Sequence, residues 1–442
     1  MTPFKHTNMI QRLLHFLDAS PVNYLAVGTI AHQLTEAGFQ EIDPRQPLPL
    51  MNAGSQFFVK KNDSSIYAFR MGAKPLSETG FRLICAHCDS PTFRIKPHAG
   101  MLCEGGLVRL NTEVYGGPIL STWFDRPLTI AGRVILRGSD AFHPDTLLIH
   151  PRRPLLQICN LAIHFNRAVN DGVALSRQKD MLPILGQITH ELESSQLFVN
   201  VILEELHHQR PVDASDILDF DLYLADATPA CTFGPHNELV SSGRLDDLSM
   251  CHAGLEALIA SSTNDATQAL AVFDNEETGS QTKQGAASPF LASIIQRLAM
   301  QQSSSAEAFH QAVERAFMVS ADNAHAFHPN YPEKYDPTNH PVLGGGPVVK
   351  YNAAQKYASD AFSASVFFEI CRDAGVSCQR FVNHSDVAGG STLGNILASS
   401  LPVAGVDMGN PILAMHSCRE TASVCDHLQC IKAFTHFYQM EV

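Results

Sequence analysis

One short apolar segment that ends in acidic residues constrains the fold more than any other feature of the chain. Residues 269–273 (Ala-Leu-Ala-Val-Phe) are apolar throughout, and residues 274–279 (Asp-Asn-Glu-Glu-Thr-Gly) follow directly. An apolar run that ends in a polar, glycine-containing turn predicts a buried strand that emerges into a loop. Neighbouring side chains of an extended segment point to opposite faces, so Glu276 and Glu277 can have different roles. Adjacent glutamates usually lie on a solvated surface, but at a buried strand end each needs a partner or a metal ion.

Four other segments place candidate metal ligands at comparable positions. Apolar runs at residues 81–86, 316–321 and 412–415 are predicted strands, and each precedes an acidic or histidine side chain. These side chains are His87 and Asp89 after the first run, Asp322 after the second and His416 after the third. Asp246 lies just before a helix predicted to start near Leu248. Because ligands of open α/β sheets bind outside the carboxyl ends of strands, we expect all five segments to meet at one edge.

These side chains match the charge and donor requirements of two zinc ions. Two Zn²⁺ ions carry four positive charges; Asp246, Glu277 and Asp322 supply three negative charges, and a bridging hydroxide completes the balance. His87 and His416 add neutral nitrogen ligands. The set suits zinc, with manganese and cobalt as alternatives.

Each candidate also has an ordinary interpretation when it is considered alone. His87 could be a surface or hydrogen-bonded core histidine, Asp246 a helix N-cap, and Asp322 a turn residue. Asp89, two residues beyond His87, is expected to orient the imidazole as a neighbour of the metal ligand. The joint placement of these residues at strand ends is what favours a metal site.

Helix and strand patterns alternate in both terminal parts of the chain. Helical patterns occur near residues 9–16, 24–37, 288–300 and 361–374, and strand patterns at 57–70, 81–86, 269–273, 316–320 and 403–406. This alternation predicts an α/β fold, a doubly wound sheet with helices on both faces. Between about Arg94 and Cys231 the pattern changes to short β-rich runs with glycine turns. We therefore predict one α/β domain from residues 1–93 and 233–442, and an inserted β-rich domain at residues 94–232.

Composition limits the classes of function. The chain has 442 residues, 45% of them hydrophobic, and a formal net charge of −13, which argues against a general nucleic-acid binder. No uncharged apolar run approaches the length that spans a bilayer, so no membrane partner is expected. The eleven cysteines are odd in number and scattered, which indicates reduced thiols in a cytoplasmic protein.

Taken together, the motifs resemble those of the aspartyl aminopeptidase family, dinuclear zinc exopeptidases. The matches stand in the family's order and span nearly the whole chain. They are residues 86–91, 115–117, 123–128, 160–164, 243–248, 274–280, 321–326, 390–392 and 415–417. The resemblance implies a zinc-exopeptidase type of doubly wound sheet and removal of an N-terminal residue, Asp or Glu, from peptide substrates.

The resemblance also implies roles for individual residues. One metal ion is held by His87, Asp246 and Asp322, and the other by Asp246, Glu277 and His416, so that Asp246 bridges. The catalytic residues are Glu276 as general base, Asp89 behind His87, and His164, which a neighbouring subunit contributes. The substrate-binding residues are His164, Asp322, His325, Lys350 and Tyr357. Family members are large homo-oligomers, commonly dodecamers, in which the inserted domain acts as a lid and subunit interface.

Three departures from the family pattern affect the expected substrate preference and leave the metal ligands intact. Asp247 stands where Asn is expected, and residues 351–356 and 387–389 also differ. Two other functions use the same features: a dinuclear deacylase or carboxypeptidase on the same scaffold, and a catalytically silent, metal-stabilised scaffold protein. The presence of Glu276 argues against the silent scaffold, because a scaffold needs no general base.

Overall fold

The computed structural model describes residues 3–188 and 194–441 and divides into two compact units. The first unit comprises residues 1–89, 230–415 and 420–442, and the second comprises residues 90–229 together with residues 416–419. The domain boundaries predicted from the sequence, residues 1–93 and 233–442 with an insertion at 94–232, stay a prediction. One difference is that the short segment after Met415, which contains His416, belongs to the second unit.

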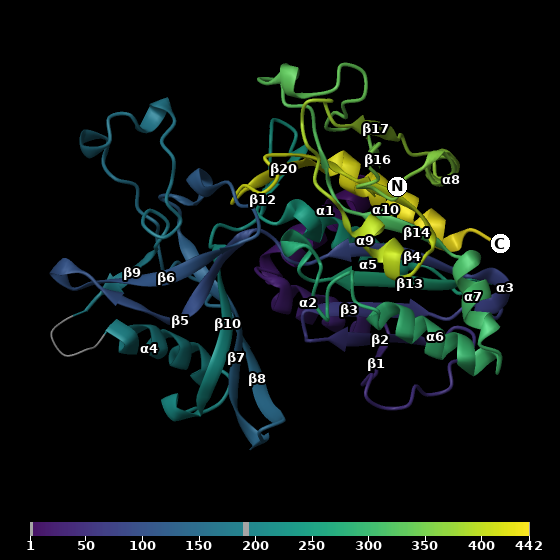
Figure 1. The fold of residues 1–442 in the computed structure, drawn as a ribbon, viewed down its shortest axis with the longest axis horizontal. Coiled ribbons are helices and arrows are strands. Elements are labelled where there is room, and N and C mark those ends of the chain that lie inside the picture. The colour runs from purple at the N-terminus through teal and green to yellow at the C-terminus, as the bar shows by residue number, and fades with distance from the viewer. Residues whose placement is uncertain (1–2, 189–193, 442) are drawn as a thin grey trace. The chain divides into compact units, whose positions relative to one another are not determined.

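Among the described residues, the first unit is built on a nine-stranded sheet (Figure 1). Its strands, in spatial order, are β1 (Gln40–Glu41), β2 (Gln56–Lys61), β3 (Ser65–Arg70), β13 (Thr267–Phe273), β4 (Phe81–His87), β14 (Phe317–Ala321), β18 (Ala404–Gly409), β16 (Val348–Tyr351) and β17 (Gln379–Val382). The central strands β13, β4, β14 and β18 are parallel to one another. Their carboxyl ends therefore lie at the same edge of the sheet.

Both faces of this sheet are covered by helices because its central strands are apolar on both sides. In β13, Leu270 and Val272 join one hydrophobic cluster, whereas Ala269, Ala271 and Phe273 join the other. The first cluster includes residues of α1 (Pro3–Ala19), α2 (Asn23–Glu36), α5 (Leu245–Ala260), α8 (Ala361–Asp373) and α10 (Val424–Gln439). The second includes residues of α3 (Leu76–Thr79), α6 (Phe290–Gln302), α7 (Glu307–Glu314) and α9 (Leu393–Ser400). The prediction of a doubly wound α/β sheet is confirmed.

Two strand predictions were wrong in detail. The run at residues 57–70 is a hairpin of two antiparallel strands, β2 and β3, because Asn62 and Asp63 adopt left-handed backbone conformations that reverse the chain. The run before His416 contains β19 (Pro411–Leu413), which belongs to a separate five-stranded sheet. That sheet also contains β11 (Cys231–Phe233), β12 (Leu239–Ser242), β20 (Glu420–Ser423) and β15 (Ala324–His325). The sequence predicted that the strand before His416 ends at the edge of the main sheet. That prediction is wrong, because this strand belongs to the five-stranded sheet.

The second unit contains a six-stranded antiparallel sheet with one helix packed on it. The strand order is β8 (His143–Ile149), β7 (Leu128–Asp140), β10 (Ile217–Asp226), β5 (Thr92–Leu102), β6 (Leu107–Tyr115) and β9 (Ile184–Gln187). Phe198, Ile202 and Leu206 of α4 (Ser194–His207) belong to the same hydrophobic cluster as Val134 and Leu222 of this sheet. The β-rich character predicted for the inserted segment is therefore present.

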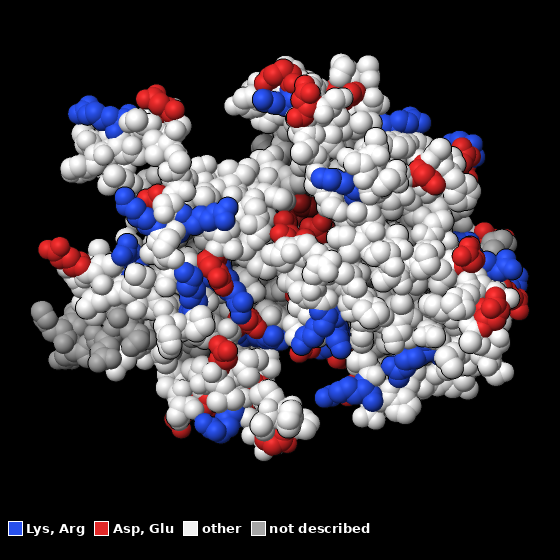
Figure 2. Space-filling model, in the orientation of Figure 1, with Lys and Arg blue, Asp and Glu red and all other residues white. Residues whose placement is uncertain are grey.

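Short 3₁₀ helices connect several of these elements. They are η1 (Glu104–Gly106), η2 (Leu120–Trp123), η3 (Ile163–Phe165), η4 (Val169–Asp171), η5 (Ala214–Asp216), η6 (Glu276–Thr278) and η7 (Pro332–Lys334). Within the described ranges, none of the helices combines the length and the apolar character needed to cross a bilayer. Figure 2 shows basic and acidic side chains interspersed over one face of the molecule.

Candidate metal centre

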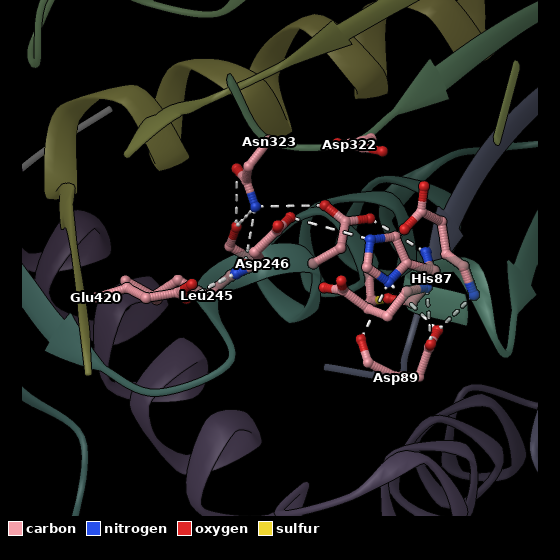
Figure 3. A network of polar contacts seen from close by, with 12 residues as sticks. His87, Asp89, Leu245, Asp246, Asp322, Asn323 and Glu420 are labelled. Carbon is pink, nitrogen blue, oxygen red and sulfur yellow. Dashed lines mark hydrogen bonds and ion pairs between the residues drawn. The ribbon is translucent and has the colours of Figure 1, made fainter. Parts of the chain in front are cut away.

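Three adjacent parallel strands bring the candidate ligands of the first unit to one edge of the main sheet. His87 ends β4, and its partner in the parallel ladder is Phe273, the last residue of β13. Glu276 and Glu277 lie in η6, three and four residues beyond Phe273. On the other side of β4, Ser320 of β14 pairs with Cys85, so Asp322 follows β14 at the level of His87. His87 and Asp322 therefore follow neighbouring strands at one edge of the sheet, and both are labelled in Figure 3.

Among the described residues, one group has the donor atoms and spacing to hold a metal ion. His87, Asp246 and Glu277 each offer one ligand atom, and these atoms lie within 4.8 Å of one another. His87 and Asp246 are 1% and 3% exposed, and His87 Nε2 lies 3.9 Å from Asp246 Oδ1. One imidazole nitrogen and two carboxylate oxygens are ordinary ligands of zinc, so these residues fit the ion that the sequence implies.

The imidazole of His87 is oriented by Asp89. Nδ1 of His87 lies 3.0 Å from the backbone oxygen of Asp89 and 3.4 Å from its carboxylate Oδ1. A carbonyl oxygen only accepts, so Nδ1 is the donor to Asp89, and Nε2 is the ring atom that faces Asp246. The backbone N–H of His87 donates to Asp247 Oδ2 at 3.1 Å, which fixes the end of β4 against the start of α5.

The carboxylate of Asp89 also holds the two glutamates. Its Oδ1 accepts from the backbone N–H of Glu276, and its Oδ2 accepts from the backbone N–H of Glu277, both at 3.1 Å. Asp89 is 3% exposed. One buried carboxylate therefore joins the end of β4 to the turn after β13, and it fixes the backbone from which both glutamate side chains project.

Asp246 lies in the distorted first turn of α5. Arg244 occupies the N-cap position in a left-handed conformation, and the φ/ψ of Asp246 itself (−82°, 107°) is not helical. The N-cap interpretation of Asp246 is therefore wrong. The backbone N–H of Asp246 donates to Glu420 Oε2 at 3.0 Å, and Glu420 is 1% exposed. This bond anchors the turn that presents the Asp246 carboxylate.

Asn323 stabilises the same turn from the opposite side (Figure 3). Its side-chain amide donates to the backbone oxygen of Leu245 at 2.8 Å and lies 3.0 Å from Ser249 Oγ and 3.3 Å from Asp247 Oδ1. Neither Asn323 nor Glu420 was among the site residues predicted from the sequence. The position of Asn323 directly after Asp322 could have indicated its role in the sequence. No feature of the sequence around Glu420 indicated a role.

Buried negative charge dominates the electrostatics of the centre. Burial raises the pKa of Glu277 well above its ordinary range, and the nearby Asp246 raises it further. Burial likewise raises the pKa of Glu276 from 4.5 to about 8, with Asp322 and Asp89 adding to the shift and His87 opposing it. Burial lowers the pKa of His87, but Asp247 and Asp89 outweigh it, so that the net shift is upward. Clustered buried carboxylates of this kind are stabilised by a bound cation.

Asp322 lies close to this group and is held by a buried lysine. Lys350 of β16 is 3% exposed, and its Nζ lies 2.7 Å from the backbone oxygen of Asp322 and 3.0 Å from its Oδ1. The same Nζ lies 5.4 Å from the centre of the Tyr357 ring. Asp322 is not among the three residues whose ligand atoms cluster. The clustered residues are Asp246, which was predicted for both metal sites, His87 from the first site and Glu277 from the second. The role of Asp322 as a metal ligand stays a prediction.

The remaining predicted site residues are in varied surroundings. Tyr357 is 5% exposed, and burial raises the pKa of its phenol. His325 is exposed, and its ring centre is 5.9 Å from that of Phe381. His164 is exposed in η3 of the second unit. His416 also belongs to the second unit, where its Nδ1 lies 3.2 Å from the backbone oxygen of Gly117. The functions of these four residues stay predictions.

Comparison with known proteins agrees with this geometry. A family model described as aminopeptidase I zinc metalloprotease (M18) matches residues 16–438. A relative from Clostridium acetobutylicum, named "Probable M18 family aminopeptidase 2", is 47% identical over 430 residues, which cover 97% of this chain and 98% of the relative. A chain in the cryo-EM structure of the Ape4 and Nbr1 complex has 34% sequence identity to this chain and a TM-score of 0.94. The match covers 98% of this chain and 86% of that chain.

A more distant structure, the S. cerevisiae mApe1 dodecamer, shares the fold at 24% identity with a TM-score of 0.86, over 98% of this chain and 97% of that chain. The family match spans nearly the whole chain, and the clustered His87, Asp246 and Glu277 supply ligands of the kind that zinc prefers. The chain therefore belongs to the M18 family of aminopeptidase I zinc metalloproteases and is a zinc-dependent aminopeptidase.

Proposed function

We propose that this aminopeptidase removes single N-terminal residues, with a preference for Asp and Glu, and that Glu276 is its general base. The main observation in support of this mechanism is that the two adjacent glutamates differ in their relation to the cluster of ligand atoms. Both are fixed through the carboxylate of Asp89, but only Glu277 belongs to the cluster of ligand atoms. Glu276 lies near enough to His87 and Asp322 for their charges to affect its pKa. It is therefore a carboxylate beside the metal ligands that is available for proton transfer.

The metal ions are proposed to be two zinc ions per subunit, with manganese or cobalt as substitutes. His87, Asp246 and Asp322 would hold one, and Asp246, Glu277 and His416 the other. The bound metal ions supply Lewis-acid polarisation of the scissile carbonyl and lower the pKa of the attacking water. Burial raises the pKa of Glu277, so a bound cation would favour the charged form of this carboxylate.

The chain's own residues then move the proton and bind the substrate. Glu276 accepts the proton of the attacking water at a carboxylate oxygen and delivers it to the nitrogen of the leaving amine. His325 and Tyr357 are proposed to line the pocket for the first residue of the substrate. Lys350, to which the resemblance gives a substrate-binding role, is proposed to line the same pocket.

A homo-oligomer is proposed to complete the active site. The S. cerevisiae mApe1 structure is a dodecamer, and the present chain is proposed to form a comparable assembly in the cytoplasm. His164, which is exposed in the second unit, would then reach the active site of a neighbouring subunit. There its ring would stabilise the oxyanion of the tetrahedral intermediate.

A panel of peptides that differ at the N-terminus tests the proposed activity. Matched peptides that begin with Asp, Glu, Ala or Leu, each with a free and an acetylated amino group, would be incubated with zinc-loaded enzyme. We expect release of the first residue from free Asp and Glu peptides, slower release from the neutral ones, and none from acetylated peptides. Hydrolysis of acetylated peptides, or release from the carboxyl end, would favour the deacylase or carboxypeptidase instead. Absence of turnover would favour the silent scaffold.

A further inference from the structure

Three consecutive backbone N–H groups in the turn between β13 and η6 donate to two buried carboxylates. Glu276 and Glu277 donate to the carboxylate of Asp89. The residue before them, Asn275, donates to Oδ1 of Asp274 at 2.8 Å. Asp274 is 1% exposed. Asp89 therefore holds this turn from the end of β4, and Asp274 holds it from the end of β13.

The carboxylate of Asp274 is itself held by two segments that are distant in the chain. Its Oδ1 accepts from Asn23 Nδ2 at 3.0 Å, and the side chain of Ser64 also hydrogen-bonds to it. Asn23 begins α2, and Ser64 lies in the turn between β2 and β3; both residues are buried. A buried carboxylate without hydrogen bonds is costly, so these donors determine where Asp274 lies.

The amide of Asn23 has a single orientation because both of its ends are hydrogen-bonded. Its Oδ1 accepts from the backbone N–H of Tyr24 at 2.9 Å, which leaves Nδ2 to face Asp274. The contact between Asn23 and Asp274 joins residues that are 251 positions apart. The first turn of α2 therefore supports, through Asp274, the turn that carries the proposed base.

The backbone at Asn275 determines how the chain enters η6. This residue has a left-handed conformation with a φ of 62°, which is uncommon outside glycine. Glu276 follows it directly. Among the described residues, the cluster of ligand atoms includes Glu277 and not Glu276. A bound metal ion would fix the side chain of Glu277, whereas Glu276 depends on its backbone, so a displaced turn should affect the base more than the metal ligand.

We propose that Asp274 is a positioning residue that holds the backbone of the general base, with Asn23 and Ser64 as its anchors. This inference rests on the proposed function, because it takes Glu276 to be the base. Asp274 acts through the N–H of Asn275 and thereby sets the position of the residue that follows. A displacement of about 1 Å at a catalytic group can cost about 10²-fold in rate.

The test compares Asp274→Ala with Asp274→Asn, whose amide oxygen can still accept from Asn275. We expect kcat of zinc-loaded Asp274→Ala to fall by about 10–100-fold, with KM and zinc content unchanged, and Asp274→Asn to recover most of the loss. Asp140→Ala is the matched control. Asp140 Oδ1 accepts from the backbone N–H of Phe142 at 2.8 Å in an exposed turn of the second unit, so kcat should not change.

Hydrogen–deuterium exchange provides a measurement that does not depend on turnover. In zinc-loaded Asp274→Ala, the backbone amides of residues 275–277 should exchange about 10-fold faster than in the unmodified enzyme, because one anchor of the turn is lost. In a Glu276→Gln background, the further change Asp274→Ala should cost little turnover, because Asp274 acts through Glu276.

Unchanged exchange or unchanged kcat in Asp274→Ala would overturn the inference, and so would additive losses of turnover in the double variant. If Asp274→Ala does not fold, Asn23→Ala removes one of the two anchors. It should then give a smaller loss of kcat and faster exchange of the same amides. Near-normal turnover of Glu276→Gln alone would contradict the proposed base instead, which distinguishes the two failures.

Discussion

The carboxylate Oδ1 of Asp89 accepts a hydrogen bond from the backbone N–H of Glu276 at 3.1 Å, which joins the ends of two neighbouring parallel strands. The backbone oxygen of the same aspartate orients His87. A single buried residue therefore orients the imidazole proposed to bind metal and fixes the backbone of the proposed base. This dependence makes the centre sensitive to residues that touch neither substrate nor metal.

Replacement of Asp89 by Ala should lower zinc affinity by about 10–100-fold, because it removes the carboxylate that holds the backbone of Glu276 and Glu277 and lies 3.4 Å from His87 Nδ1. Asp89→Asn is the control, since its amide oxygen can still accept one of the two backbone hydrogen bonds, and it should have a smaller effect. Competition with a chelator measures both variants. Equal zinc affinity in Asp89→Ala and the unmodified enzyme would show that the contacts of Asp89 do not hold the ligands.

Removal of the Asp246 side chain should release both proposed metal ions, because this carboxylate is assigned one oxygen to each. Metal analysis of purified Asp246→Ala is expected to give well below one equivalent of zinc per chain. Circular dichroism checks that the variant is folded. Retention of two equivalents would contradict the bridging role.

The stability of the metal-free protein should depend on pH because its buried carboxylates ionise. Burial raises the pKa of Glu276 from 4.5 to about 8, so the folded state binds more protons than the unfolded state between these values. This contribution to stability is fully present below pH 4.5 and is lost as pH rises through about 8. Zinc bound by the neighbouring ligands would supply positive charge beside the ionised Glu276 at the higher pH. The melting temperature with zinc, minus that with chelator, should therefore increase from pH 5.5 to pH 8.

Two other buried residues change stability in the opposite sense. Burial lowers the pKa of His427 to about 3 and that of His252 well below its ordinary value, so these residues favour the folded state at higher pH. Their contribution is the same with and without zinc and cancels in the difference of melting temperatures. A difference that stays constant or shrinks with rising pH would contradict the assignment of the carboxylate cluster to metal binding.

The proposed contribution of His164 across a subunit interface can be tested by mixing inactive variants. His164→Ala should retain its zinc and its oligomeric state but lose activity. When it is mixed with Glu276→Gln under conditions that permit subunit exchange, some sites combine an intact Glu276 with an intact His164 from the neighbour, and activity should partly return. No recovery, despite exchange shown by mass spectrometry, would mean that His164 serves its own chain's site or none.

The sequence predicted those parts of the centre that depend on local patterns. An apolar run followed by a polar turn identifies a strand end, and the shared edge of a parallel sheet then brings His87, Glu277 and Asp322 near one another. The hairpin turn at Asn62 and Asp63 was overlooked, although both residue types tolerate left-handed conformations. That signal was present in the sequence.

Other parts depend on contacts between distant segments and leave no local pattern. Glu420 anchors the backbone of Asp246 from 174 residues away, and Asn323 holds Leu245 from 78 residues away. The strand before His416 has only three residues, so its pattern could not indicate which sheet it joins. The contacts of Lys350 Nζ with Asp322 and Asn323 likewise become visible only when β16 is placed beside β18 and the turn after β14.

The most direct test of the central claim is the metal content and turnover of Glu276→Gln. Glutamine has the same shape as glutamate but cannot accept the proton, and Glu276 is assigned to no metal ion. We expect this variant to bind as much zinc as the unmodified enzyme and to lose turnover by about 10²–10⁴-fold on N-terminal Asp and Glu peptides. Near-normal turnover with full zinc occupancy would contradict the assignment of Glu276 as the general base.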